Sequence, residues 1–131
     1  MSTTDVKEEK KEAKREQKLS LNQAVLDRNL LDAAERGDLA TVQDLVAQGA
    51  DVANAKDDKF GSTALLWATA NGRTATAEWL LSHGASITER NNYGNTALLL
   101  AACFGHTATV EWLLSHGASI TERNNDVATR L

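Results

Sequence analysis

Few side chains in this sequence have the chemistry needed for catalysis or metal binding. The histidines are His83, His106 and His116, and Cys103 is the single cysteine. Zinc sites usually show paired ligands such as CxxC or HxxxH, and the sequence contains neither pair. Cys103 has no pattern that would couple a nucleophile to a base, and no glycine-rich phosphate loop, paired-carboxylate motif or triad signature is present. The sequence therefore predicts a non-catalytic protein with no metal site and no cofactor.

An internal repeat is the main signal, and it determines where any site must lie. Residues 74–92 read TATAEWLLSHGASITERNN and residues 107–125 read TATVEWLLSHGASITERNN, so the two stretches differ only at Ala77 and Val110 and are offset by 33 residues. A weaker copy lies between residues 30 and 52. A fixed period of this length is typical of a solenoid, in which each unit buries its apolar face only against its neighbours.

Local signals predict two helices and a projecting loop in each unit. Thr63 and Thr96 can accept hydrogen bonds from free backbone N–H groups as N-caps, and a short Ala/Leu helix follows each of them. A glycine ends that helix. A second helix begins at Thr74 and at Thr107, with apolar residues at i, i+3 and i+4. The polar stretch at residues 86–95 then forms a turn into the next unit.

A helix–turn–helix–hairpin unit of 33 residues resembles the ankyrin repeat. The matching residues are G-x-T-A-L-L-x-A at 61–68 and 94–101, Gly-His at 105–106, and E-W-L-L-S-H-G-A-S at 78–86 and 111–119. The resemblance implies an all-α solenoid of about three stacked units with projecting β-hairpin loops. The domain would cover residues 20–125, with units at about 20–57, 58–90 and 91–123. The family commonly has Thr-Pro-Leu-His where this chain has Thr-Ala-Leu-Leu, so packing at Leu66 and Leu99 should replace the polar links of that histidine.

The two ends of the chain differ from the repeats. Residues 1–19 are almost entirely polar, and their charges at i and i+4 repel, so we expect a flexible tail or a frayed helix that either solubilises the protein or serves in docking. Ser20 and Gln23 match a capping box, which predicts that a helix begins at Ser20 and runs to Arg36. Residues 126–131 are interpreted as the truncated start of a further repeat, so the chain is either a short form or a fragment.

Charge and composition exclude several classes of function. The net charge is −4, and residues 19–131 carry thirteen acidic against eight basic side chains. An acidic body argues against a nucleic-acid surface, which needs a basic stripe, although the lysine-rich tail could give weak, salt-sensitive binding to nucleic acid or a membrane surface. The sequence contains no run of about 18 apolar residues, the length that a membrane span needs. A single cysteine is typical of a reducing compartment, so we expect the cytoplasm or the nucleus.

Candidate binding residues follow from the family resemblance. It implies that hairpin tips and the exposed end of each first helix line a concave groove, and most of these positions differ between the otherwise similar units. The predicted partner-binding residues are Lys59, Phe60, Asn71, Arg90, Asn92, Tyr93, Phe104 and Arg123. The aromatic ones are the strongest candidates, because aromatic side chains are common binding anchors. The alternative is local packing within the hairpins. Trp79 and Trp112 are expected in the core between units.

The function predicted from these observations is that of a protein–protein interaction module. It would bind another protein, which the sequence does not identify, through the concave face of the ankyrin-repeat stack. The alternative is a targeting or regulatory arm of a longer multi-repeat protein or enzyme. The last complete unit has no polar capping repeat after it, so self-association through that end is a further possibility.

Overall fold

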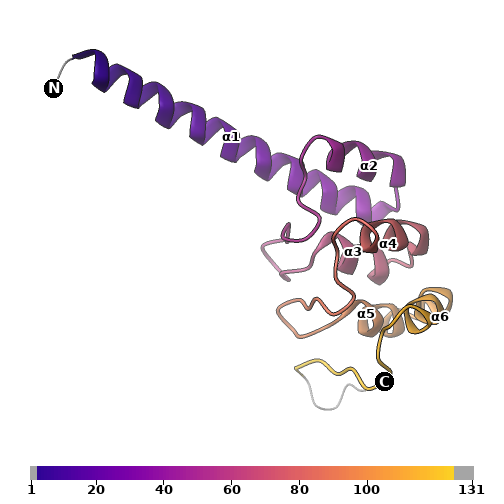
Figure 1. Cartoon of the computed structure of the whole chain (residues 1–131). Coiled ribbons are helices and arrows are strands. Elements are labelled where there is room, and N and C mark those ends of the chain that lie inside the picture. The colour runs from indigo at the N-terminus through magenta and orange to yellow at the C-terminus, as the bar shows by residue number, and fades with distance from the viewer. Residues whose placement is uncertain (1–2, 126–131) are drawn as a thin grey trace.

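A computed structural model describes residues 3–125 of the chain as a stack of helix pairs with a long helical arm (Figure 1). In the described part there are six helices: α1 (Thr3–Arg36), α2 (Leu39–Ala47), α3 (Ala64–Ala70), α4 (Thr74–Leu81), α5 (Ala97–Cys103) and α6 (Thr107–Ser115). Between residues 3 and 125 there is no regular strand, and an isolated antiparallel bridge joins Lys56 to Thr63. The predicted all-α solenoid is confirmed.

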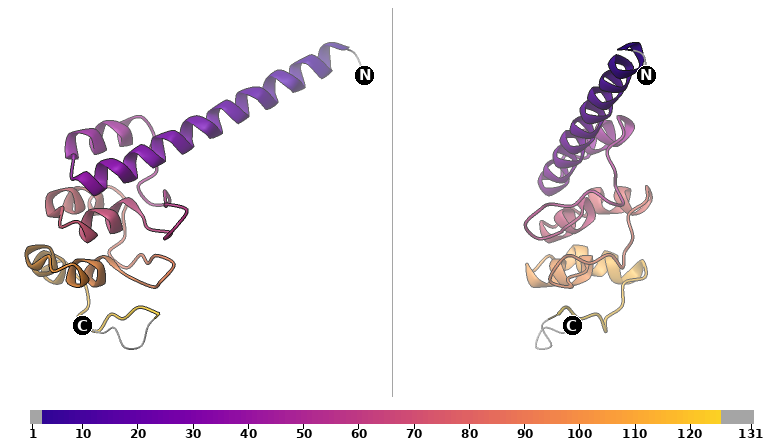
Figure 2. Two further views of the ribbon diagram at one scale, coloured as in Figure 1. Left: turned by 180° about the vertical axis from the view of Figure 1, so that it is seen from behind. Right: turned by 90° about the vertical axis from the view of Figure 1, so that its left-hand side faces the viewer.

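Each unit contributes one helix to an inner row and one to an outer row. In the inner row α3 packs against α1 on one side and α5 on the other, whereas in the outer row α4 lies between α2 and α6. The loops that join successive units project away from the helices on one side of the stack (Figure 2). A groove between the loops and the inner row is the expected consequence of this arrangement.

The helix boundaries within the repeats follow from side-chain caps, as the sequence predicted. The Thr63 hydroxyl accepts from the Leu66 N–H at 3.4 Å, and the Thr96 hydroxyl accepts from the Leu99 N–H at 3.3 Å. α4 and α6 begin at the predicted threonines. Gly72, with a φ of 70°, follows the end of α3 in the left-handed region, which favours glycine.

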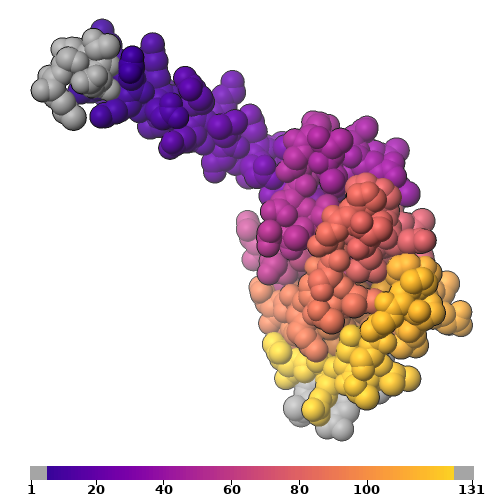
Figure 3. Space-filling model, viewed as in Figure 1, coloured from indigo at the N-terminus to yellow at the C-terminus, as the bar shows by residue number. Residues whose placement is uncertain are grey.

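The prediction that a helix begins at Ser20 is wrong. α1 is continuous from Thr3 to Arg36, so Ser20 lies inside a helix and caps nothing. Its last turns pack on the body, and adding residues to an existing helix is far easier than nucleating a new one. Glu, Lys, Ala and Arg also have good helix propensities. Side chains 6–25 are exposed, and Figure 3 shows this part of α1 projecting from the body. The predicted partial repeat at residues 126–131 lies outside the described residues.

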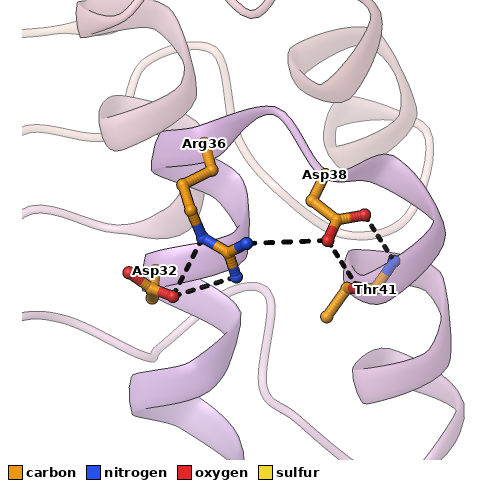
Figure 4. A network of polar contacts seen from close by, with 4 residues as sticks. All are labelled: Asp32, Arg36, Asp38 and Thr41. Carbon is orange, nitrogen blue, oxygen red and sulfur yellow. Dashed lines mark hydrogen bonds and ion pairs between the residues drawn. The ribbon is translucent and has the colours of Figure 1, made fainter.

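A polar network fixes the turn between α1 and α2 (Figure 4). The Arg36 guanidinium donates to the Asp32 carboxylate at 3.0–3.1 Å and lies 3.7 Å from the Asp38 carboxylate. Asp38 is the N-cap of α2 and accepts from the Thr41 hydroxyl at 2.7 Å and the Thr41 N–H at 3.2 Å. The Thr41 hydroxyl is the main reason that the pKa of Asp38 lies below its ordinary value.

The core runs through the stack as a series of leucines. The large apolar side chains with almost no exposed surface are Leu30, Val42, Leu65, Leu66, Leu80, Leu98 and Leu113. Trp79 and Trp112, expected in the core, pack against it but remain half-buried. Their rings stack on His83 and His116, with centroids 3.8 Å and 4.0 Å apart. No described helix is both long and apolar enough to cross a bilayer.

Candidate binding groove

Four of the predicted binding residues line one hollow between the second and third units. This aromatic hollow has a volume of about 340 Å³. Its walls include Phe60, Trp67, Asn71, Tyr93, Leu100 and Phe104. The inner-row helices α3 and α5 supply one wall, and the loops that carry Phe60 and Tyr93 supply the other. The structure therefore brings Phe60, Asn71, Tyr93 and Phe104 together.

The aromatic side chains of this hollow are arranged around Phe60. The ring centroid of Phe60 lies 6.1 Å from that of Trp67 at an interplanar angle of 64°, and 6.2 Å from that of Tyr93 at 49°. Tyr93 is 54% exposed and Phe104 is 61% exposed, whereas Phe60 is half-buried. Rigid aromatic side chains give much apolar contact area at low entropic cost, so they are suited to anchoring a partner.

A second hollow adjoins the first and has a different character. This acidic hollow, of about 660 Å³, lies between α1 and the loop at residues 54–58, and it shares Glu35 and Trp67 with the aromatic hollow. Its carboxylates are Asp27, Asp32, Glu35, Asp57 and Asp58, and its cations are Arg28 and Lys56. Sequence reasoning missed these residues, because it looked for differences between the two nearly identical units and α1 belongs to neither. The extra length of the first loop, with its Asp57-Asp58 pair, is the signal that could have found them.

Most of the carboxylates in the acidic hollow form hydrogen bonds or ion pairs within the protein. Asp57 accepts from the N–H groups of Phe60 and Ser62, both at 2.7 Å, and so fixes the loop that carries Phe60. Asp27 accepts from the Asp51 N–H at 2.9 Å, and Asp32 is paired with Arg36. Glu35 differs from them, since its carboxylate forms no ion pair or hydrogen bond with another described residue.

The other predicted binding residues lie along the loops rather than in the hollow. Arg90 donates through Nη1 to the carbonyl oxygens of Gly94 at 2.5 Å and Arg123 at 2.7 Å, so it ties two successive loops together. The Asn92 N–H donates to the Phe60 carbonyl at 2.9 Å and serves the same purpose one unit earlier. The Lys59 ammonium lies 5.2 Å from the centroid of the Phe60 ring.

The three histidines each bond to a main-chain carbonyl oxygen. His106 bonds to the Ala70 carbonyl oxygen of the preceding unit at 2.9 Å, and His83 and His116 bond to the carbonyl oxygens of the tryptophans on which they stack. Cys103 is exposed at the end of α5. Across residues 3–125, no group of three or more His, Cys, Asp or Glu side chains could hold a metal ion.

Two glutamates at equivalent positions join the loops to the helix caps. The Thr63 hydroxyl donates to Glu89, and the Thr96 hydroxyl donates to Glu122 at 2.7 Å. Burial raises the pKa of Glu89, against the opposing effects of the Thr63 hydroxyl and the Ser86 N–H. These carboxylates are therefore structural parts of the loops and lie outside both hollows.

Comparison with known proteins agrees with this architecture. A family model described as ankyrin repeats in three copies matches residues 30–124. The chain belongs to the ankyrin-repeat family. Ankyrin repeats are a type of protein-interaction module. A 64-residue stretch is also 44% identical to the 2-5A-dependent ribonuclease of Mus musculus, and it covers 49% of this chain but only 9% of that ribonuclease.

Proposed function

We propose that this ankyrin-repeat chain binds another protein through the groove formed by the acidic and aromatic hollows, without catalysing a reaction. The observation that supports this most directly is the placement of Tyr93 and Phe104. Both side chains are more than half exposed, yet both line a hollow whose backbone is fixed by the stack. Apolar aromatic surface held in a concave site is the usual form of a protein-binding anchor.

An unpartnered donor in the same groove supports the proposal. The indole N–H of Trp67 is buried and has no hydrogen-bond acceptor in the described structure. Buried donors nearly always have an acceptor, and leaving one unsatisfied costs free energy. Trp67 also lines both hollows, so a bound segment that reorients this ring would be able to supply the missing acceptor.

The test is a selection of random displayed peptides on the intact chain, followed by affinity measurements on variants. The double variant Tyr93→Ala/Phe104→Ala should weaken the selected peptides by about 30-fold or more, since loss of binding anchors typically costs about 2 kcal/mol or more. Glu78→Ala/Glu111→Ala is the matched control, because both glutamates are exposed on the outer-row helices. Circular dichroism would show that both variants are folded. Undiminished binding by a folded Tyr93→Ala/Phe104→Ala variant would exclude the groove.

A second candidate function is a targeting or regulatory arm of a longer protein. The match to 9% of a much larger ribonuclease motivates it, together with the exposed Leu114 and Ile120 on the last unit. The test is the size of the native protein in its source cells, detected with an antibody against the body. A species near 14.1 kDa would argue for an independent module, and a much larger one for an arm. As part of the leading proposal, the single cysteine favours the cytoplasm or nucleus.

A further inference from the structure

Glu35 has an unusual position for a carboxylate. It lies on the last turn of α1, is half-buried, and is the only charged residue among those that line the aromatic hollow, which it shares with the acidic hollow. Its backbone carbonyl accepts from Arg73 Nε at 3.1 Å, but no cation of residues 3–125 forms an ion pair with its side chain. A carboxylate that lines two adjoining hollows and has no ion-pair partner is available to a cation supplied by a bound segment.

The surroundings of Glu35 favour a positive charge. The acidic hollow contains five carboxylates against two cations. Asp32 is already paired with Arg36, which leaves four carboxylates against the two cations. Excess carboxylates around a concave site concentrate cations there and repel anions.

Aromatic side chains line the same hollows as this carboxylate. Trp67, like Glu35, lines both hollows, and the ring centroid of Phe60 lies 6.1 Å from that of Trp67. The faces of tryptophan, tyrosine and phenylalanine attract an ammonium or guanidinium within about 6 Å. The position of the Lys59 ammonium, 5.2 Å from the Phe60 centroid, shows that a cation is already accommodated at one of these rings.

We propose that the groove selects a polypeptide segment with a lysine or arginine next to an apolar side chain. The cation lies between the Glu35 carboxylate and the Trp67 ring, and the apolar side chain enters the aromatic hollow beside Tyr93 and Phe104. This inference rests on the proposed function and adds the chemistry of the partner. It also disfavours phosphate-bearing ligands at this site, because their charge has the same sign as that of the groove.

The experiment uses the groove-dependent peptides from the display selection on the intact chain. Groove-dependent peptides are those whose binding is weakened by Tyr93→Ala/Phe104→Ala. These peptides should be enriched in lysine and arginine relative to the unselected library. The best peptide is then synthesised in two forms, one with its cation and one with norleucine in its place, and each is measured against the wild type and against Glu35→Gln. Asp44→Asn, on the exposed side of α2, is the control for loss of one negative charge.

Glu35→Gln should weaken the cationic peptide by about tenfold and leave the norleucine peptide nearly unchanged, whereas Asp44→Asn should change neither. The coupling in this double-mutant cycle isolates the contact between the cation and Glu35. In parallel, the indole N–H resonance of Trp67, assigned with Trp67→Phe, should shift more with the cationic peptide.

The possible failures differ in meaning. Groove-dependent peptides that are neutral or acidic, or equal losses for both peptides on Glu35→Gln, would overturn this inference and leave the proposed function standing. If no selected peptide depends on Tyr93 and Phe104, the proposed function fails and this inference fails with it.

Discussion

Arg73 and His106 occupy the same position in successive units. Each bonds to a main-chain carbonyl of the preceding unit, one through a guanidinium and the other through an imidazole. Arg73 donates to the Glu35 carbonyl at 3.1 Å, and His106 bonds to the Ala70 carbonyl at 2.9 Å. Each side chain lies over a glycine of the preceding unit, Gly37 or Gly72. These glycines are therefore required twice, once for a positive φ and once for the space that the side chain above them fills.

Substitution of Gly72 by alanine should separate these two requirements. The new Cβ would lie 2.6 Å from His106 Nδ1, whereas the equivalent Cβ at Gly105 would meet nothing within 4 Å. Both positions have similar positive φ values, so Gly105→Ala measures the backbone strain alone, about 1–2 kcal/mol. Gly72→Ala should lower the free energy of unfolding by more than that in urea titrations. Adding His106→Ala should remove the excess; an excess that persists would place the clash elsewhere.

Glu89 should give the protein a specific dependence on pH. Burial raises its pKa above the ordinary 4.5, so the folded state binds this proton more tightly than the unfolded state does. The contribution of Glu89 to stability is thus greatest below pH 4.5 and declines as the pH rises through the folded pKa. The unfolding free energy of the wild type minus that of Glu89→Gln should decrease as the pH rises from about 4 to about 7, because only the wild type loses this contribution. A difference that stays level or rises with pH would contradict the assignment, and the exposed Glu111→Gln is the control.

The sequence predicted those residues of the repeats whose roles are local. Thr63 and Thr96 could be recognised as caps because an N-cap needs only its own helix. Glu35 and Trp67 could not be recognised as parts of one groove, since they come from different units and line the same hollows only after stacking. Arg90 was predicted to contact a partner because the family resemblance places it in the projecting hairpin, but its hydrogen bond to the next loop at Arg123 arises only from stacking.

The long helix α1 consists of two parts, of which only the last turns are stabilised by packing against the body. Its last turns carry buried Leu30 and Leu31 and pack against α2 and α3. Its first part is solvated, and the ion pair between Glu12 and Arg15, at 3.5 Å, joins side chains that are both more than half exposed. Such pairs contribute about 0–1 kcal/mol, and the like charges at i and i+4 oppose the helix. The like charges of this segment led us to expect a flexible tail or a frayed helix, and the start of the helix was misplaced because the Ser20 motif also fits inside a helix.

Deletion of residues 1–18 should therefore leave the melting temperature unchanged within about 2 °C, because the described side chains of this segment, those of residues 6–18, are all exposed. The helical signal in circular dichroism should fall in proportion to the residues removed. Deletion of residues 1–26 is the contrasting variant: it also removes half-buried Leu26 and the bond from Gln23 to the Gly49 carbonyl at 2.9 Å, and should lower the melting temperature. A large loss with the shorter deletion would show that the arm stabilises the body.

Equivalent apolar side chains are buried to different extents in the second and third units of the stack. Leu81 and Ile87 of the second unit are half-buried and pack against the core, because the third unit covers them. At the equivalent positions of the third unit, Leu114 is 37% exposed and Ile120 is 64% exposed. Nearly identical sequences thus have different burial, which no reading of one unit alone could predict. In a solenoid the stability of a unit depends on its neighbours as well as on its own residues.

Amide hydrogen exchange should report this difference directly. Local opening costs least where buried contacts are fewest, so amides of residues 107–123 should exchange faster than those of residues 74–90. The comparison is unusually well controlled, because the two segments differ in sequence only at Ala77 and Val110. Mass spectrometry of the monomer would resolve the two segments, and a dilution series would detect association through the exposed leucine and isoleucine, which would slow exchange at high concentration.

A fourth unit with a polar outer face, appended after residue 125, should remove the difference. It would cover Leu114 and Ile120 as the third unit covers Leu81 and Ile87, and each fully buried aliphatic side chain contributes about 1.5–3 kcal/mol. The added unit should slow exchange in residues 107–123 toward the rate of residues 74–90 and raise the melting temperature. A matched version whose inner face carries serine in place of leucine should do neither. If both segments already exchange equally in the unmodified monomer, and the added unit changes nothing, the third unit is fully stable as it stands, and its exposed side chains are no basis for self-association.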